Sequence, residues 1–218
     1  MDFSFLPKYY TFFLEGAKNT LIIALFTVLF GTILGLVLSL MKISSKKVIK
    51  FIASAYIEFV RGTPILVQLY IVYYGLPAIG IELPDILAGI VTLSLNSGAY
   101  VAEVIRAGIN AVDKGQMEAA RSLGMSNSLT MKHVIIPQAF KNILPALGNE
   151  FITIIKESSI VSVIGIHELM YKANTVRGNI FRPFEPLIIV ALMYFVLTFT
   201  CSKLLGIAER RLKKVDSR

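Results

Sequence analysis

The feature that most constrains this chain is a series of long apolar runs. The clearest, TLIIALFTVLFGTILGLVLSL, begins at Thr20 and contains no charged residue. A helix needs roughly 20 mostly apolar residues to cross the hydrocarbon core of a bilayer. Five stretches meet this requirement, and the chain is 55% hydrophobic with only 17% charged residues. The sequence therefore predicts an all-α membrane protein, a single domain over 1–218 with five transmembrane helices at about 14–41, 50–76, 85–108, 142–165 and 186–207.

The distribution of Lys and Arg predicts the orientation of these spans. If the N-terminus lies outside, most of the 22 basic residues fall in cytoplasmic segments, and the opposite orientation reverses this bias. The net charge of +8 does not indicate nucleic-acid binding, because the basic residues flank apolar runs. The basic tail, 209–218, is expected to be a positive-inside stop signal; contact with anionic lipid is the alternative.

A polar stretch between the third and fourth runs predicts a compact cytoplasmic hairpin at about 109–138. Good helix formers fill 116–123, and Gly124 follows at the position of a left-handed C-terminal residue. Ser126 or Asn127 can then cap a second helix, which is expected to run until Pro137 interrupts it.

Motifs in three parts of the chain resemble the permease subunits of bacterial ABC importers, in the subgroup for polar amino acids. The segment FVRGTPILVQLYIVYYGLP, which begins at Phe59, resembles the second-span motif of that subgroup, and KESS at 156–159 agrees with it. The hairpin carries the EAA signature. Its matching residues are Glu118, Ala119, Ala120, Gly124, Ile136 and Pro137.

This resemblance implies a multi-pass subunit of the bacterial inner membrane, with the type I ABC importer permease fold, an outside N-terminus and a cytoplasmic C-terminus. The hairpin would be the coupling helix that docks on an ATPase. Expected partners are two ATPase subunits, a second identical or homologous permease chain, an extracytoplasmic binding protein, an amino-acid substrate and the lipid bilayer. An idle amphipathic loop on the lipid headgroups is the alternative for the hairpin. The residues expected to couple to the ATPase are Glu118, Ala119, Ala120, Leu123 and Gly124.

Charged residues inside the predicted spans require partners or a water-filled cavity, since each costs roughly 3 kcal/mol or more at mid-depth. Glu58 and Arg61 lie three residues apart and are expected to pair. Lys156 is expected to pair with an acid of another span, because its neighbour Glu157 projects about 100° away around the helix.

A polar stripe on the third span is a candidate wall of the translocation path. Asn96, Tyr100, Glu103 and Ala107 recur at helical spacing, and Ser97 lies beside them. Hydrogen bonding between helices is the alternative role for such residues. The polar cluster in KESS is the second candidate wall. The predicted substrate-contact residues are Asn96, Ser97, Tyr100, Glu103, Lys156, Glu157, Ser158 and Gln68.

These residues suggest how an amino acid would be bound. Lys156 or exposed backbone amides would hold its carboxylate, and Glu103 would hold an ammonium or guanidinium group. The excess of acids within the spans favours a basic amino acid as substrate. The break formed by Gly62, Thr63 and Pro64 in the second span is a hinge or gate, a substrate contact or a packing kink.

Other function classes fit the sequence less well. No phosphate-binding GxxxxGK[ST] motif occurs, so ATP and Mg are expected on the partner ATPase and no cofactor on this chain. His133 and His167 have no ligand-spaced companions, which argues against a metal site and against an enzyme. An ion-coupled secondary transporter would be expected to show internal repeats, and none is visible. A membrane scaffold that recruits a cytoplasmic protein is a further alternative.

The outer connection, 166–185, remains open to two interpretations. A short helix is expected around 167–174, and the segment either gates an external opening or only docks the binding protein.

Overall fold

The computed structural model describes the backbone of residues 1–216 and the side chains of residues 1–210. Helices account for most of the described part of the chain, which contains no β-strand. Their bounds are α1 Leu6–Ile43, α2 Lys47–Gly62, α3 Ile65–Ala78, α4 Asp85–Asn110, α5 Lys114–Ser122, α6 Asn127–Thr130, a π-helix Met131–Ile135, α7 Ile136–Glu157, a 3₁₀-helix Ser158–Ile164, α8 Leu169–Ile180 and α9 Glu185–Asp216.

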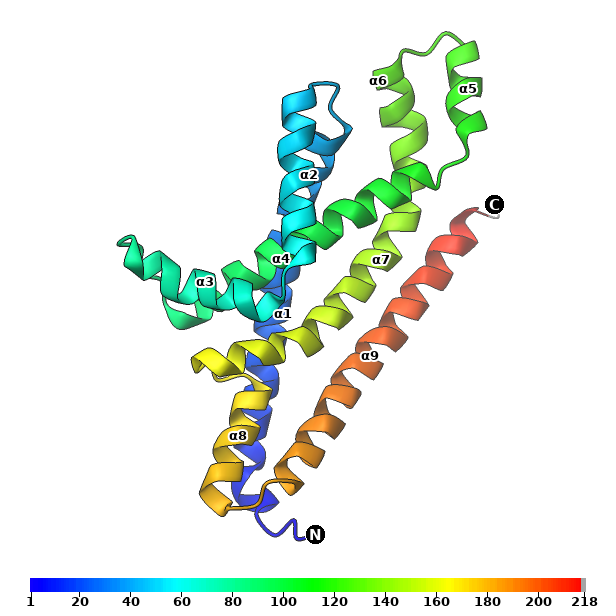
Figure 1. The fold of residues 1–218 in the computed structure, drawn as a ribbon. Helices are drawn as coiled ribbons and strands as arrows, with labels where there is room; N and C mark the ends of the chain where they lie inside the picture. Colours follow the sequence, from blue (N-terminus) through cyan, green and yellow to red (C-terminus); the bar gives the residue numbers. More distant parts are fainter. Residues whose placement is uncertain (217–218) are drawn as a thin grey trace.

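Several of the connections between helices lie at two opposite ends of the molecule, while the α2–α3 and α3–α4 connections lie between these ends (Figure 1). The N-terminus and the α8–α9 loop lie at one end, and the α1–α2 loop, the α5–α6 hairpin and the C-terminal end of α9 lie at the other. The second end therefore carries the connections that the sequence assigns to the cytoplasm. We call it the hairpin end and the first the outer end.

Three helices are long and apolar enough to cross a membrane in the described part of the chain. They are α1, α4 and the first 26 residues of α9. At 1.5 Å per residue, α1 is about 57 Å long, so it extends beyond a hydrocarbon core of about 30 Å or tilts within it. Side chains of the basic tail beyond Arg210 lie outside the described residues.

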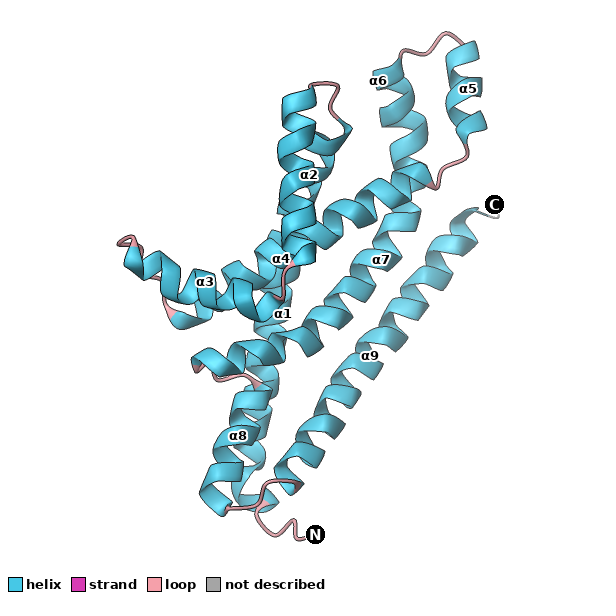
Figure 2. Ribbon diagram, in the orientation of Figure 1, coloured by secondary structure: helices cyan, strands magenta, loops and turns pink. Residues whose placement is uncertain are grey.

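The other two predicted spans are not continuous α-helices. Span 50–76 is divided at Thr63 and Pro64, which Figure 2 shows as a short loop between α2 and α3. Span 142–165 changes from α7 to a 3₁₀-helix at Ser158 and ends at Gly165, whose φ is +86°. The five-span count therefore stays a prediction.

The centre of the fold is a close contact between α1 and α4, which glycines permit. A Cβ atom on Gly35 would lie 2.6 Å from Cγ1 of Val101, and one on Gly98 would lie 2.7 Å from Cδ2 of Leu34. Small residues of this kind let helix backbones approach closely in membranes, where packing replaces the hydrophobic effect. The sequence spacing of Gly31 and Gly35 places both on the face of α1 that meets α4.

Buried charges fix α8 at the outer end. The carboxylate of Glu168 is fully buried and accepts hydrogen bonds from the first backbone amides of α8 and from Oη of Tyr194, at 2.6 Å. Lys172 is 3% exposed, and its Nζ lies 2.8 Å from Oε2 of Glu15 on α1. The predicted outer helix is thus present, longer than expected, and held against both α1 and α9.

The N-terminus is tied to the α8–α9 loop by a surface ion pair. Nη2 of Arg182 lies 2.6 Å from Oδ2 of Asp2. The hydrogen bond from Arg182 holds the pKa of the Asp2 carboxyl far below its usual range. Since that pKa is lowered, the ion pair persists from neutral into mildly acidic pH and is lost only when the pH falls through the lowered value.

Candidate translocation site and coupling hairpin

The break between α2 and α3 is stabilised by one glutamine. Pro64 has no backbone N–H to donate to the carbonyl of Val60, four residues earlier. Nε2 of Gln68 donates to this Val60 oxygen at 2.7 Å, and to the carbonyl and hydroxyl oxygens of Thr63 at 3.1 and 2.9 Å. Gln68 thus satisfies the backbone that the proline leaves without a donor. A Cβ atom added to Gly62 would have no neighbour within 4 Å, so the break borders open space.

Two of the predicted contact residues on α4 form hydrogen bonds to other helices. Nδ2 of Asn96 donates to Oε1 of Gln68 at 3.1 Å, which ties α4 to the break. Oγ of Ser97 donates to Oε1 of Glu150 on α7 at 2.8 Å. Asn96 is 5% exposed and Ser97 is fully buried, so both side chains connect helices.

The side chain of Tyr100, one turn further along α4, is partly exposed. It is 40% exposed, and the guanidinium carbon of Arg61 lies 5.3 Å from the centre of its ring. The expected pair between Glu58 and Arg61 is absent: within the described residues no carboxylate lies at ion-pair distance from Arg61. The physical reason is that Arg61 finds an aromatic face on α4, and a cation over such a face is attracted by the negative charge of its π system.

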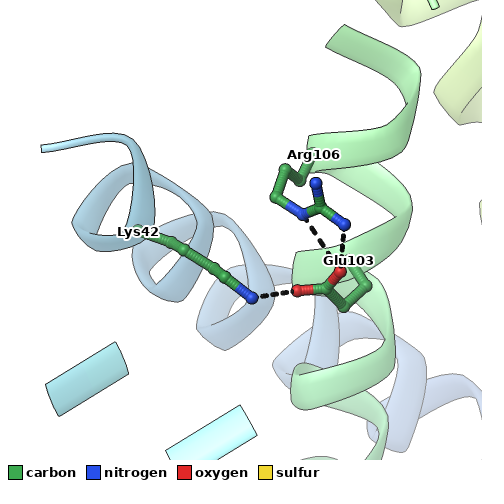
Figure 3. A network of polar contacts seen from close by, with 3 residues as sticks. All are labelled: Lys42, Glu103 and Arg106. Atoms are coloured by element: carbon green, nitrogen blue, oxygen red, sulfur yellow. Dashed lines mark hydrogen bonds and ion pairs between the residues drawn. The ribbon is translucent and has the colours of Figure 1, made fainter. Parts of the chain in front are cut away.

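Glu103 lies in a three-residue charge cluster at the hairpin end (Figure 3). Its Oε1 is 2.5 Å from Nζ of Lys42 on α1, and its Oε2 is 2.7 Å from Nη2 of Arg106 on α4. Both carboxylate oxygens are therefore engaged by basic side chains. The role of Glu103 as a substrate contact stays a prediction, but in this arrangement the residue joins α1 to α4.

The KESS residues lie at the end of α7 and the start of the 3₁₀-helix, in different surroundings. Lys156 lines a cavity of about 290 Å³ together with Met170 of α8 and Leu187 and Tyr194 of α9. No carboxylate of a described residue lies at ion-pair distance from Lys156, so its expected partner on another span is absent.

The next two residues have different surroundings. Glu157 is exposed at the C-terminal end of α7. Ser158 is fully buried, and its Oγ donates to the backbone carbonyl of Ile155. The structure therefore does not bring Lys156 together with the polar residues of α4.

The hairpin has the geometry that its sequence predicts up to the second helix. Asp113 caps α5 by accepting from the amide of Gly115 at 2.7 Å. Gly124 has φ +83°, and the amides of Gly124 and Met125 donate to Arg121 and Ala120, which is a Schellman motif. These bonds end α5 sharply and make the turn stiff.

The predicted coupling residues differ in exposure. Ala120 is 5% exposed and packs inside the hairpin, whereas Leu123 is 85% exposed at its tip. Glu118 and Ala119 are exposed on α5, and Gly124 forms the turn. The hairpin thus presents an apolar side chain to the space beyond the molecule.

The expected interruption at Pro137 is wrong. Ser126 caps α6, as one of the two predicted alternatives, but the chain continues through the π-helix Met131–Ile135 into α7, where Pro137 lies in the first turn. The wider π turn accommodates the proline ring, which has no N–H to donate to a carbonyl of the preceding turn. Nε2 of Gln138 donates to the Val134 carbonyl at 3.0 Å beside this turn.

Sequence reasoning left Arg61 and Glu150 out of the candidate site. Both were visible as charged residues in apolar runs, which marks them as candidates. Their contacts with Tyr100 and Ser97 cross between helices, however, and no spacing along one chain segment reveals such contacts.

Comparison with known proteins decides the family. Residues 20–214 match the family described as the binding-protein-dependent transport system inner membrane component. This chain belongs to that family. It is 48% identical over 217 residues to the arginine transport system permease protein ArtQ of Bacillus subtilis, covering 99% of each chain.

Solved structures agree with this assignment. A crystal structure of an amino acid ABC transporter with histidines contains a chain that is 55% identical, with a TM-score of 0.94, covering 97% of this chain and 99% of that one. A chain of the MetNI methionine ABC transporter, 18% identical, has a TM-score of 0.80 over 97% of this chain and 99% of its own, which supports the shared fold alone. The chain is thus the membrane component of a transport system that works with a binding protein and an ATPase.

Proposed function

We propose that this chain is the permease subunit of an ATP-driven importer for polar, basic amino acids. The observation that carries the proposal is the stiff hairpin with its exposed Leu123, in a chain that is similar throughout its length to amino-acid permeases. One relative is named as an arginine permease and one similar structure is that of a transporter with histidines, and both support a basic substrate.

The assembly that we propose contains two permease chains, identical or homologous, around one path. Two ATPase subunits bind ATP and Mg and dock on the hairpins, and a binding protein delivers the substrate at the outer end. The chain crosses the inner membrane five times, with α2–α3 and α7 with its 3₁₀ extension as the two interrupted spans. Broken helices are tolerated at membrane depth where they are buried in protein or line water.

Contacts within the chain divide the predicted substrate residues into two groups. Tyr100, Lys156 and Glu157 have exposed side chains and are the better candidates for direct contact. The others use their polar atoms within the protein, so they shape the site; they are Asn96, Ser97, Glu103, Ser158 and Gln68. The break at Gly62, Thr63 and Pro64 is proposed as a hinge whose resting geometry Gln68 defines.

Coupling through the hairpin is tested with Leu123→Asp. Burial of a leucine side chain contributes roughly 1.5–3 kcal/mol, and a carboxylate in an apolar groove costs free energy. The variant should retain its fold but lose ATP-dependent uptake of L-arginine and co-purification of the ATPase. Leu129→Asp, at an exposed leucine on α6, is the comparison variant. Uptake that continues unchanged in Leu123→Asp would contradict the proposed coupling.

A further inference from the structure

The polar surroundings of Tyr100 contain groups that the proposed coupling does not use. Arg61 projects from the last turn of α2, beside the break, and Glu150 comes from the middle of α7. They contact α4 at Tyr100 and Ser97 respectively. Ser97 and Tyr100 are three residues apart on one helix, which places their Cβ atoms about 5 to 6 Å apart. A cation and an anion from two different helices thus meet the same turn of α4.

The arrangement of Arg61 leaves its donors free. Its guanidinium lies over the Tyr100 ring, a contact that uses the flat face of the group. The N–H groups point outward in the plane of the guanidinium, and none of them donates a hydrogen bond to a described residue. Such a planar fork matches the geometry of a carboxylate.

At the position of Arg61, unpaired N–H donors cost free energy unless a ligand or water binds them. The α2–α3 junction lies midway between the two ends of the molecule (Figure 1), within the predicted span 50–76. An unpaired charge at this depth must face a cavity, water or a partner of opposite charge. Arg61 and Gly62 are both exposed, and a Cβ atom on Gly62 would meet no neighbour within 4 Å, so a ligand or water can reach the guanidinium.

Glu150 complements Arg61. One of its oxygens accepts from Ser97, and no basic side chain of a described residue lies at ion-pair distance from it. The buried hydroxyl of Ser97 holds the Glu150 carboxyl group against α4, where no basic side chain of a described residue pairs with it. We infer that Arg61 and Glu150, which contact α4 at Tyr100 and Ser97 respectively, bind the zwitterionic backbone of an amino acid.

In this site Arg61 holds the α-carboxylate and Glu150 holds the α-ammonium group. The inference rests on the proposed function, and it assigns the carboxylate to Arg61 instead of Lys156, which lies in the cavity towards α8 and α9. The Gln68 hydrogen bonds to Val60 and Asn96 hold the end of α2 in place, so the guanidinium is positioned before a ligand arrives. In this arrangement the pair contacts only the groups that all amino acids share, so it recognises amino acids as a class.

The test measures binding to the purified permease–ATPase complex without the binding protein, which would select ligands itself. L-Arginine, L-histidine and L-glutamine are titrated, and the tightest ligand is compared with its C-terminal amide, which lacks the negative charge. The wild-type complex should prefer the free acid by about tenfold or more, the size expected for a charge-assisted contact. In Arg61→Gln the affinity for the acid should fall to that for the amide, while Arg61→Lys should retain part of the preference.

A parallel pair of measurements examines Glu150. Glu150→Gln keeps an acceptor for Ser97, and it should remove the preference for the free amino acid over its N-acetyl derivative. Glu58→Gln is the matched control, because Glu58 is an exposed charge on the same helix as Arg61. It should leave both preferences and the basal ATP hydrolysis of the assembled complex intact.

Three results would overturn the inference. They are equal wild-type affinity for acid and amide, an equal loss of affinity for both ligands in Arg61→Gln, and absence of amino-acid binding to the complex. Failure of the proposed function would give different results. The wild-type permease would then copurify with no ATPase, or would show no ATP-dependent uptake.

Discussion

At the scale of single residues, the polar side chains of this protein mostly satisfy other parts of the chain. Gln68 is the clearest case, since its amide replaces the donor that Pro64 lacks and also receives a bond from Asn96. Glu103 is a second case, with each oxygen bound to a different basic residue. A polar residue in an apolar helix is therefore weak evidence for a substrate contact until its hydrogen bonds are known.

Gln68→Leu should destabilise the permease. The substitution leaves the Val60 carbonyl without a donor, and such an unsatisfied buried group costs roughly 1–3 kcal/mol. The midpoint of thermal unfolding in detergent measures the effect. Gln116→Leu is the control, because the side chain of Gln116 is exposed on the hairpin. Equal midpoints for the two variants would show that Gln68 does not support the break.

Glu103→Gln separates a structural role from substrate contact. If the residue joins α1 to α4, the variant should unfold several degrees lower while the KM for uptake of L-arginine stays unchanged. The loss is expected because Lys42 and Arg106 would keep their charges without the carboxylate. A raised KM with unchanged thermal stability would instead support the predicted contact with a basic substrate.

At the scale of helices, packing depends on where small residues lie. The α1–α4 contact places Gly35 against Val101 and against the backbone of Ala102, so even one methyl group meets atoms that cannot move easily. The opposite case is α3, where Gly75 has no neighbour within 4 Å. Gly35 and Gly75 therefore differ in their importance for helix packing, although both lie in predicted spans between apolar residues.

Gly35→Ala should destabilise the protein, while Gly75→Ala should not. Extra volume in a close-packed contact typically costs about 1–3 kcal/mol, whereas alanine at an open helical position improves helix propensity by up to about 1 kcal/mol. Yield of folded protein and the thermal midpoint measure both variants side by side. A smaller loss at Gly35 than at Gly75 would contradict the close α1–α4 packing.

At the scale of the whole molecule, the two ends have different roles. The hairpin end carries the α1–α2 loop, the α5–α6 hairpin and the end of α9, and the outer end carries the N-terminus and α8 (Figure 1). The buried Glu168 and Lys172 hold α8 to α1 and α9. A gating movement of α8 alone would expose both charges, so α8 is expected to move together with α1 and α9.

The orientation of the chain is tested by labelling single cysteines in a Cys201→Ser background. An impermeant maleimide added to intact cells should label a cysteine at Gly178 on α8 and should not label one at Ser44 or Ser126. Labelling all three positions after permeabilisation is the control for reactivity. Labelling of Ser44→Cys in intact cells, with Gly178→Cys protected, would reverse the assignment of the two ends.

The sequence alone determined the features that depend on local chemistry. Apolar runs of membrane length predicted the helical membrane class, and the glycine at position 124 predicted the left-handed end of α5. The motif around Glu118, Ala119 and Ala120 indicated the family that residues 20–214 match. Each of these features is encoded within one segment, since helix propensity, span length and turn conformation involve residues close together in the chain.

Only the tertiary structure decided which polar groups satisfy one another. Arg61 could have paired with Glu58 on its own helix, but its guanidinium lies over the ring of Tyr100 on α4 instead. Lys156 and Glu157 are adjacent, yet only Lys156 faces the cavity beside α8 and α9. Pro137 continues a helix because the preceding π turn accommodates it. These outcomes depend on the positions of neighbouring helices, which hydrophobic periodicity along a single segment does not specify.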